Sequence, residues 1–364
     1  MLEETLDVYR ELQQHLDEFA VGFPATESGV EIRILRHLFS PDEAKLATIL
    51  DDKYETLEAV YERAKDLVSS PVELKKILDK MVSKGSIHFK KVEGERHYAN
   101  AHLIIGMFEY QLDKLTKEFL EDFAQYAKEG FGMELFGNEV PQFRTIPVEE
   151  SVTPEHQLPT YEELRKVVEN AQGPITVQKC ICRQAHELIG DLCKATSRQE
   201  TCMVFGDMAQ VYLDEGWGRA VSKEEALELL RKNEEEGLVL QADNAQQTEF
   251  ICSCCGCCCG VLSSLKEFPN VAKFLKPRYY AEIDPELCVG CGTCIDRCQL
   301  DAIKSRKEIS KVNIKRCIGC GNCVAVCPEE AIKLIKRDKV GEPPENKEQM
   351  FEKILEAKMK MKGM

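Results

Sequence analysis

Two short cysteine runs near the carboxyl end decide how this chain folds: CVGCGTCIDRC at residues 288–298 and CIGCGNCVAVCP at residues 317–328. In each run two residues separate the first three cysteines, and three residues precede the fourth. The flanking residues repeat as well, since Ala302-Ile303-Lys304 corresponds to Ala331-Ile332-Lys333. Each repeat is therefore expected to fold as a strand, a cysteine loop, a helical turn and a returning strand.

This spacing suits a metal cluster with four corners, because closely spaced thiolates can wrap three corners while a distant thiolate reaches the fourth. The glycines inside each run let the backbone approach the metal closely. The pattern resembles that of the bacterial ferredoxins with two [4Fe–4S] clusters, over residues 280–337. In that family the fourth cysteine of each run ligates the cluster of the other run. The resemblance therefore implies two ligand sets, which are Cys288, Cys291, Cys294 and Cys327 for one cluster and Cys317, Cys320, Cys323 and Cys298 for the other.

The first run departs from the ferredoxin pattern at one position, where Gln299 follows the last cysteine in place of the usual proline. This change is expected to loosen a turn without removing a ligand. A four-cysteine zinc site is the simpler alternative, but zinc sites do not show two tandem runs with this repeated spacing. The spacing therefore favours iron–sulfur clusters.

The remaining cysteines form two segments upstream of the repeat. The first segment contains Cys180, Cys182, Cys193 and Cys202, and the second contains Cys252, Cys254, Cys255, Cys257, Cys258 and Cys259. We expect two additional [4Fe–4S] clusters, one in each segment, with Cys252, Cys255 and Cys259 as the favoured ligands in the second. Three alternatives stay open: ligands shared between the segments, one larger cluster, or a zinc site with free thiols.

The combined pattern also resembles a group of ferredoxin-containing proteins of anaerobic bacteria and archaea. In that group a Cys-Ile-Cys-Arg segment, here residues 180–183, and a cysteine-rich segment ending in Cys-Gly precede a dicluster domain. The resemblance spans nearly the whole chain and implies electron transfer without naming a donor. We expect low-potential, oxygen-sensitive clusters, because many thiolate-bound irons would lie near short, glycine-rich loops. Arg183 and His186 lie in this region, where charge or hydrogen bonds would tune a cluster. A lone histidine at this spacing is, however, typical of a surface or packing residue.

The 364 residues are too many for one compact core and predict an α+β, multidomain chain. Ser40, Ser70, Thr160 and Ser222 each begin a capping box, which predicts a helix N-terminus. A β-hairpin is expected over residues 86–99 and a further helix over 106–128. The order of helices and hairpin resembles a winged-helix domain. We predict a helical winged-helix-like domain (1–110), a helix and connector (111–160), a mostly helical or irregular cysteine-rich iron–sulfur module (161–277), a two-[4Fe–4S] ferredoxin domain of the (βαβ)2 type (278–340) and a helical tail (341–364).

The composition points to a reducing compartment. The sequence shows no basic and apolar signal segment at its start and no apolar run long enough to cross a membrane. We therefore expect a cytoplasmic protein whose 18 cysteines bind metal rather than form disulfides. The sequence carries no nicotinamide, flavin or nucleotide fingerprint and no assignable catalytic residues, so a partner protein is expected to perform the chemistry.

Two functions are consistent with these observations. The favoured one is an iron–sulfur relay that passes low-potential electrons to or from a partner oxidoreductase, with the oligomeric state left open. The alternative is a redox-sensing, DNA-binding transcription regulator, since the second helix and the hairpin are basic. The basic residues there are Lys75, Lys76, Lys80, Lys84, Lys90, Lys91 and Arg96. The net charge of −15 and the acidic residues among them disfavour general affinity for DNA.

Overall fold

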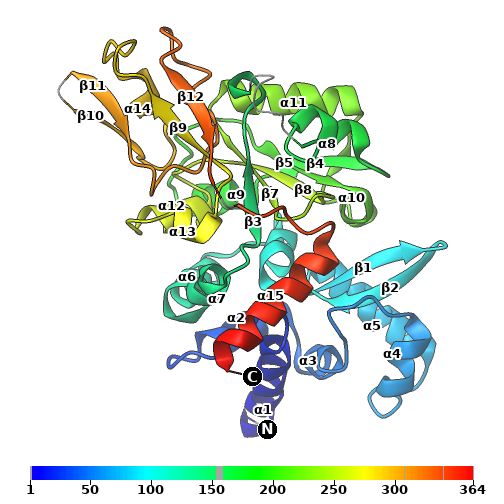
Figure 1. Cartoon of the computed structure of the whole chain (residues 1–364). Coiled ribbons are helices and arrows are strands. Elements are labelled where there is room, and N and C mark those ends of the chain that lie inside the picture. Colours follow the sequence, from blue (N-terminus) through cyan, green and yellow to red (C-terminus); the bar gives the residue numbers. More distant parts are fainter. Residues whose placement is uncertain (1, 153–158, 307, 339, 364) are drawn as a thin grey trace. The chain divides into compact units, whose positions relative to one another are not determined.

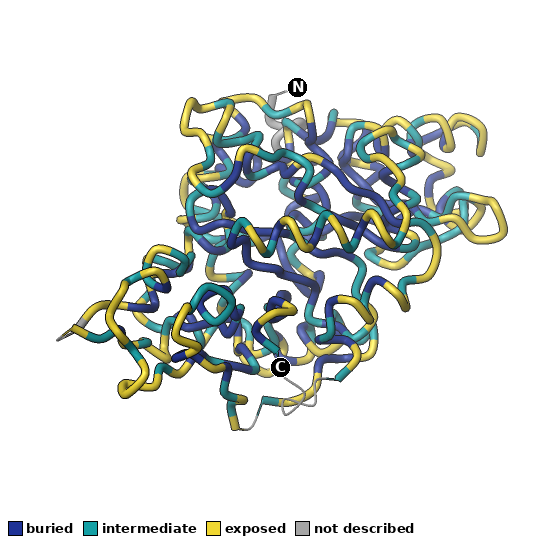
Figure 2. The backbone as a smooth tube through the Cα atoms, turned by 90° about the horizontal axis from the view of Figure 1, so that it is seen from above, coloured by how far each residue is buried: buried dark blue, intermediate teal, exposed yellow. Residues whose placement is uncertain are grey.

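The computed structural model of the chain describes residues 2–152, 159–306, 308–338 and 340–363 (Figure 1). It consists of two compact units. Unit 1 contains Met1–Asn138, Gln210–Trp217 and Ile354–Met364, and unit 2 contains Glu139–Ala209 and Gly218–Lys353. Exposed residues are concentrated in loops and on outward helix faces (Figure 2). The structure combines helices with antiparallel strands, which is consistent with the predicted α+β class.

Unit 1 is mostly helical and carries one β-hairpin. Its elements are α1 (Leu2–Asp17), α2 (Val30–Leu38), α3 (Pro41–Ala47), α4 (Leu57–Ala64), α5 (Pro71–Lys84), β1 (Ile87–Val92), β2 (Glu95–Asn100), the short turns η1 (Leu103–Met107), η2 (Glu109–Gln111) and η3 (Ala127–Phe131), α6 (Lys117–Tyr126) and α7 (Gly132–Gly137). Two further helices of the chain are α10 (Gly206–Asp214) and α15 (Lys347–Lys362), and the second confirms the predicted helical tail.

The capping boxes start the predicted helices of unit 1. At α3 the Ser40 side chain accepts a hydrogen bond from the Glu43 N–H, while the Glu43 carboxylate accepts one from the Ser40 N–H. Helix α5 has only half of a box, since Ser70 caps the Glu73 N–H but the Glu73 carboxylate binds Ser69. Both helix starts are confirmed.

The predicted hairpin is also confirmed, with Ile87 paired to Asn100 and Val92 paired to Glu95. Its turn residues Glu93 and Gly94 have φ values of 53° and 90°, as a two-residue hairpin turn requires. The winged-helix assignment stays a prediction. The continuous helix expected over residues 106–128 is wrong, because α6 begins only at Lys117. Asp113 adopts a left-handed φ of 58°, which interrupts a helix before Thr116 caps α6.

Unit 2 is built on a six-stranded antiparallel sheet in the order β3-β7-β8-β5-β4-β6. The strands are β3 (Phe143–Ile146), β4 (Ile175–Lys179), β5 (Glu200–Phe205), β6 (Arg219–Ala220), β7 (Val239–Asp243) and β8 (Phe250–Cys254). Associated helices are η4 (Glu149–Ser151), α8 (Leu164–Asn170), α9 (Ile181–Leu188), α11 (Lys223–Glu235), α12 (Gly260–Lys266) and α13 (Ala272–Leu275).

Most residues of 161–277 are helical or irregular as predicted, but the prediction missed this sheet. One face of the sheet packs against α8 and α11, in a core that includes Met203, Leu240 and Ile251 (Figure 1). The other face is covered as well, since every residue of β7 is buried. Strands buried on both faces lack the alternation of apolar and polar residues by which a half-buried strand is recognised.

The capping box predicted at Thr160 does not form. Helix α8 begins at Leu164, and no side chain caps its first turn. Glu162 instead is buried, forms an ion pair with Arg278 and accepts a hydrogen bond from Tyr279 Oη at 2.9 Å. A long-range ion pair thus replaces the local cap. The box at Ser222 is confirmed, since its side chain caps the Glu225 N–H at the start of α11.

The two cysteine repeats form two antiparallel strand pairs that share one hydrophobic core. Strand β9 (Tyr279–Ile283) pairs antiparallel with β12 (Ile332–Lys336), and β10 (Ile303–Arg306) pairs with β11 (Ile309–Val312). The first repeat contains the predicted helical turn as α14 (Thr293–Arg297), whereas the second passes through turns alone. Across the described residues, every helix is too short or too polar to span a bilayer.

Candidate functional site

Two cavities lie between the repeats, and each is lined by four cysteines. Cys288, Cys291, Cys294 and Cys327 line the first cavity. Cys298, Cys317, Cys320 and Cys323 line the second. Each cavity thus receives three cysteines from one run and the fourth from the other. The structure brings together the eight residues in the two sets that the ferredoxin resemblance implies, because the antiparallel pairs place the end of each run beside the start of the other.

Backbone N–H groups point at several of these sulfur atoms. The N–H groups of Ala281 and Ala302 lie 3.3 Å from the Sγ atoms of Cys317 and Cys298. The N–H of Ser310 lies 3.5 Å from Cys288 Sγ. Hydrogen bonds of this kind favour the thiolate over the thiol and tune the potential of a bound iron–sulfur cluster.

The glycines of the runs are required by close backbone contacts. Gly290 has a φ of 69°, and a Cβ atom there would lie 2.0 Å from the Glu308 carbonyl oxygen. Gly319 has a φ of 68°, and its Cβ atom would lie 2.5 Å from the Tyr279 carbonyl oxygen. Any larger residue would push the loop away from its cavity.

The surroundings of the cavity cysteines shift the pKa of individual thiols in different directions. Burial raises the pKa of Cys320 to about 12 and raises that of Cys323 well above its usual range. Cys291 is exposed, and hydrogen bonds from the Thr293 hydroxyl and N–H lower its pKa. The raised pKa values of Cys320 and Cys323 favour the protonated thiol unless a metal cation replaces the proton. This donor set therefore fits a metal–thiolate cluster.

Residues 281–334 match the 4Fe-4S dicluster domain family. The two cavities lie within this dicluster domain, and the eight cysteines that line them fit the cluster type that its description names. The match supports iron–sulfur binding by this part of the chain. No curated protein and no solved structure matches the chain.

Gln299 explains why the first run lacks the usual proline. Its side-chain oxygen accepts a hydrogen bond from the Gly256 N–H at 2.9 Å, and its side-chain nitrogen donates to the Gly237 carbonyl at 3.2 Å. A proline has no such side chain. Gly256 lies between Cys255 and Cys257, so Gln299 connects the dicluster domain to the second upstream cysteine segment. Where the sequence predicts a loosened turn, Gln299 instead adds two hydrogen bonds that hold this turn to neighbouring loops.

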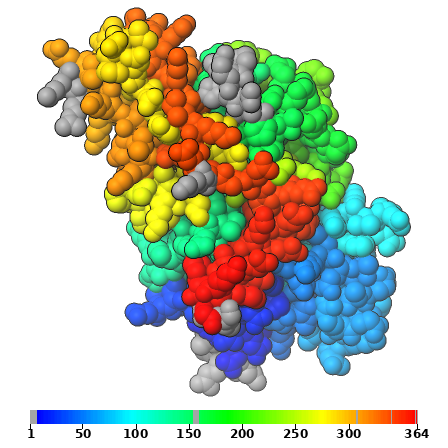
Figure 3. Space-filling model, in the orientation of Figure 1, coloured from blue at the N-terminus to red at the C-terminus, as the bar shows by residue number. Residues whose placement is uncertain are grey.

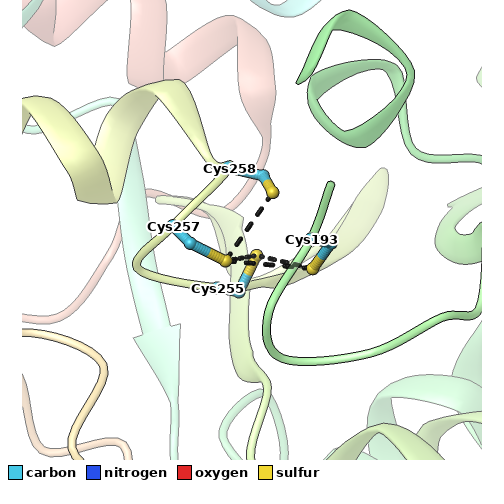
Figure 4. A group of neighbouring side chains, drawn as sticks. All are labelled: Cys193, Cys255, Cys257 and Cys258. Carbon is cyan, nitrogen blue, oxygen red and sulfur yellow. Dashed lines mark hydrogen bonds between the residues drawn. The ribbon is translucent and has the colours of Figure 1, made fainter. Parts of the chain in front are cut away.

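The upstream cysteines form two groups that cut across the two sequence segments. Cys193 lies with Cys255, Cys257 and Cys258, and their sulfur atoms point toward one another (Figure 4). We call these residues the four-thiol group. Cys193 Sγ lies 3.7 Å from Cys255 Sγ and 3.8 Å from Cys257 Sγ. The structure thus does not place Cys193 with Cys180, Cys182 and Cys202, and it favours the sharing of ligands between segments.

The spacing of the four-thiol group is that of a single tetrahedral ion. Thiolates bound at about 2.3 Å to one tetrahedral metal lie about 3.8 Å apart. The Sγ atoms of Cys255 and Cys257 lie 3.5 Å apart, and those of Cys257 and Cys258 lie 3.6 Å apart. All four sulfur atoms lie within 4.8 Å of one another. Hydrogen bonds from the Thr196 and Ala195 N–H groups outweigh burial and lower the pKa of Cys193 to about 6.

The other six upstream cysteines form what we call the six-thiol ring: Cys180, Cys182, Cys202, Cys252, Cys254 and Cys259. Each thiol interacts with two others, and the contacts close a ring. Around the ring the order is Cys180, Cys182, Cys259, Cys254, Cys252, Cys202 and back to Cys180.

Strand register explains this ring. Cys202 on β5 and Cys252 on β8 are direct cross-strand partners. Cys252 and Cys254 share a face because they alternate along β8. Met203 and Ile251 belong to the opposite, helix-covered face. Cys252-x-Cys254 was the one local signal of this arrangement in the sequence, since a two-residue period in a strand places both thiols on one side.

Arg183 and His186 have different surroundings. Arg183 is 2% exposed and donates to Thr201 Oγ1 and to the Ser253 carbonyl at 3.0 Å. His186 lies 3.2 Å from Asp191 at the surface, as expected for a residue that is not a ligand. Of the two side chains, Arg183 is the one that interacts with a thiol of these groups, that of Cys193.

Proposed function

We propose that this chain is an electron-transfer protein that relays single electrons between a partner oxidoreductase and iron–sulfur clusters held by the dicluster domain. The observation that carries the proposal is the pair of cavities, each lined by four cysteines drawn from both runs. A [4Fe–4S] cluster with four thiolate ligands has no open coordination site, so it supplies one-electron transfer. We assign one such cluster to each cavity.

The two cavities differ in their access to solvent, which suggests a direction for the relay. Cys291 is exposed, and its neighbours Leu287 and Val289 are 48% and 65% exposed. Cys317 and Cys323 of the other cavity are buried. The yellow and orange atoms of the dicluster repeats form part of the molecular surface in Figure 3. A partner would exchange electrons at the Cys291 side, because transfer requires close approach.

The buried cavity leads toward the four-thiol group. Gln299 follows the cavity ligand Cys298, and its hydrogen bond to Gly256 reaches the loop that carries Cys255 and Cys257. We propose one thiolate-bound ion in the four-thiol group. An iron ion there would extend the relay, whereas a zinc ion would only fix the loop.

The DNA-binding alternative is disfavoured by the ion pairs of the basic residues in unit 1. Lys75 pairs with Asp79, and Lys80 and Lys84 both pair with Glu43. Arg96 pairs with Asp79 and Glu215. Phosphate contacts would have to break these pairs, so the basic helix and hairpin offer less free positive charge than their composition suggests.

The decisive experiment compares two serine variants of the anaerobically purified chain. Cys320→Ser should disturb the buried cavity and Cys291→Ser the exposed one, and each should alter a different electron paramagnetic resonance (EPR) signal of the reduced protein. Spectra that are unchanged in both variants, or that lose the same signal in both, would refute the assignment.

A further inference from the structure

The six-thiol ring gathers its sulfurs from five elements or element ends of unit 2. Cys180 follows β4 and precedes α9, Cys182 lies in the first turn of α9, and Cys259 precedes α12. Cys202 and Cys252 lie opposite each other in the sheet. Apolar packing does not require six thiols in this closed arrangement, because cysteine is otherwise used in a core as a small apolar residue without a preferred partner.

The ring is wider than a site for one ion. In the four-thiol group all sulfur atoms lie within 4.8 Å of one another, and within the described ranges no other group of three or more potential ligands meets this limit. No three thiols of the ring therefore lie within 4.8 Å of one another, although each interacts with two neighbours. A single tetrahedral ion needs sulfurs about 3.8 Å apart in every pair, so the ring suits a centre with several metal ions.

A buried cation lies between the two groups of thiols. Arg183 forms no ion pair with a carboxylate in the part of the chain that the structure describes, and its Nε atom has no hydrogen-bond partner there. Glu236, the carboxylate that feels its charge, is paired with Arg198 at 2.8 Å. Arg183 donates instead to Thr201 Oγ1 and to the Ser253 carbonyl at 3.0 Å, and these residues lie next to Cys202 and between Cys252 and Cys254 in the sequence. A buried, unpaired guanidinium is costly unless anions surround it.

We propose that the six-thiol ring binds one polynuclear iron–sulfur cluster, separate from the metal of the four-thiol group, with Arg183 as the buried counter-cation of both. The inference rests on the proposed iron–sulfur function. Each thiol that ligates iron releases its proton to solvent as the iron–sulfur bond forms, and this exchange leaves the oxidation state of the cysteine sulfur unchanged. Thiolates and sulfide together would supply the neighbouring negative charge that balances the buried Arg183 guanidinium.

The test measures iron, inorganic sulfide and zinc in the full-length chain after anaerobic purification with iron and sulfide supplied. The double variant Cys202→Ser/Cys252→Ser removes the cross-strand pair of the ring. Its matched control, Cys193→Ser/Cys255→Ser, removes half of the four-thiol group and leaves the ring intact. Relative to the unsubstituted chain, the ring variant should lose about four or more irons and a similar amount of sulfide, and it should retain the EPR signals of the dicluster domain.

The control variant tests the same idea even if the ring variant fails to fold. It should hold about four or more irons beyond the roughly eight of the dicluster domain. An iron content of about eight in the control, or a ring variant that loses only zinc or a single iron without sulfide, would overturn the proposal. If the unsubstituted chain showed no EPR signals of the dicluster domain, the proposed function itself would be refuted. Failure of the ring proposal and failure of the proposed function are therefore distinguishable.

Discussion

Glu43 offers a quantitative test of how unit 1 is held together. Its side chain is 3% exposed and contacts Lys84, Lys80 at 3.0 Å and the Ser40 N–H at 2.8 Å. Burial alone would raise the pKa of Glu43, but the hydrogen bonds from Lys84 and Ser40 and then from Lys80 outweigh burial and lower it from 4.5 to about 2. The folded state therefore prefers the ionised carboxylate more than the unfolded state does.

The substitution Glu43→Gln removes this charge and keeps an acceptor for the Ser40 N–H. A pKa lowered from 4.5 to about 2 corresponds to at most about 3.5 kcal/mol, at about 1.4 kcal/mol per pKa unit. We expect Glu43→Gln to lower the free energy of unfolding of unit 1 by about 2–3 kcal/mol at neutral pH. Since the folded pKa is the lower one, the contribution is complete above pH 4.5 and is lost as the pH falls toward 2.

The assay is urea unfolding followed by the fluorescence of Trp217, the only tryptophan of the chain, which belongs to unit 1 and packs 4.9 Å from Tyr110. Lys80→Met serves as the control, because the Lys80 side chain is 67% exposed and an exposed pair contributes less than about 1 kcal/mol. Equal stability of the unsubstituted chain and Glu43→Gln at pH 7, or a difference that grows below pH 4, would refute this reasoning.

Three further substitutions probe unit 2. Gln299→Met removes the hydrogen bonds to Gly256 and Gly237 while keeping the side-chain length, and should lower the free energy of unfolding of unit 2 by about 1–3 kcal/mol. The assay is anaerobic thermal unfolding followed by cluster absorbance, and an unchanged midpoint would show that these bonds are dispensable. Glu162→Gln leaves the Arg278 charge partly buried without its carboxylate and should cost about 3 kcal/mol in the same assay, whereas a smaller loss than for Gln299→Met would contradict the importance of this ion pair. Arg183→Gln should lower the reduction potential of the cluster proposed for the six-thiol ring, because a cation stabilises the more negative reduced state. Arg183→Lys should largely preserve this potential, and equal potentials of the two variants in a redox titration would argue against a charge effect.

The features that sequence predicts well in this chain are local. The spacing within the runs at 288–298 and 317–328 predicts that three cysteines of each run share one site. The family resemblance predicts that the fourth cysteine of each run belongs to the site of the other run. The caps at Ser40 and Ser222 likewise depend on residues three positions apart. Such features need no knowledge of distant segments.

The features that sequence did not reveal depend on long-range pairing. The central sheet escaped prediction because β7 is buried on both faces and lacks alternation. The division of the upstream cysteines into four and six depends on the register that places Cys202 opposite Cys252, which adjacent letters do not encode. The Thr160 box failed because the buried Glu162 pairs with Arg278 from a distant strand region.

The most direct test of the central claim is low-temperature EPR of the anaerobically purified, dithionite-reduced chain, with spins counted against iron and sulfide. Two clusters held by the cysteines of the dicluster domain should give at least about two spins and about eight irons per chain, with matching sulfide. A colourless, EPR-silent chain that carries zinc at those eight thiols would contradict the account.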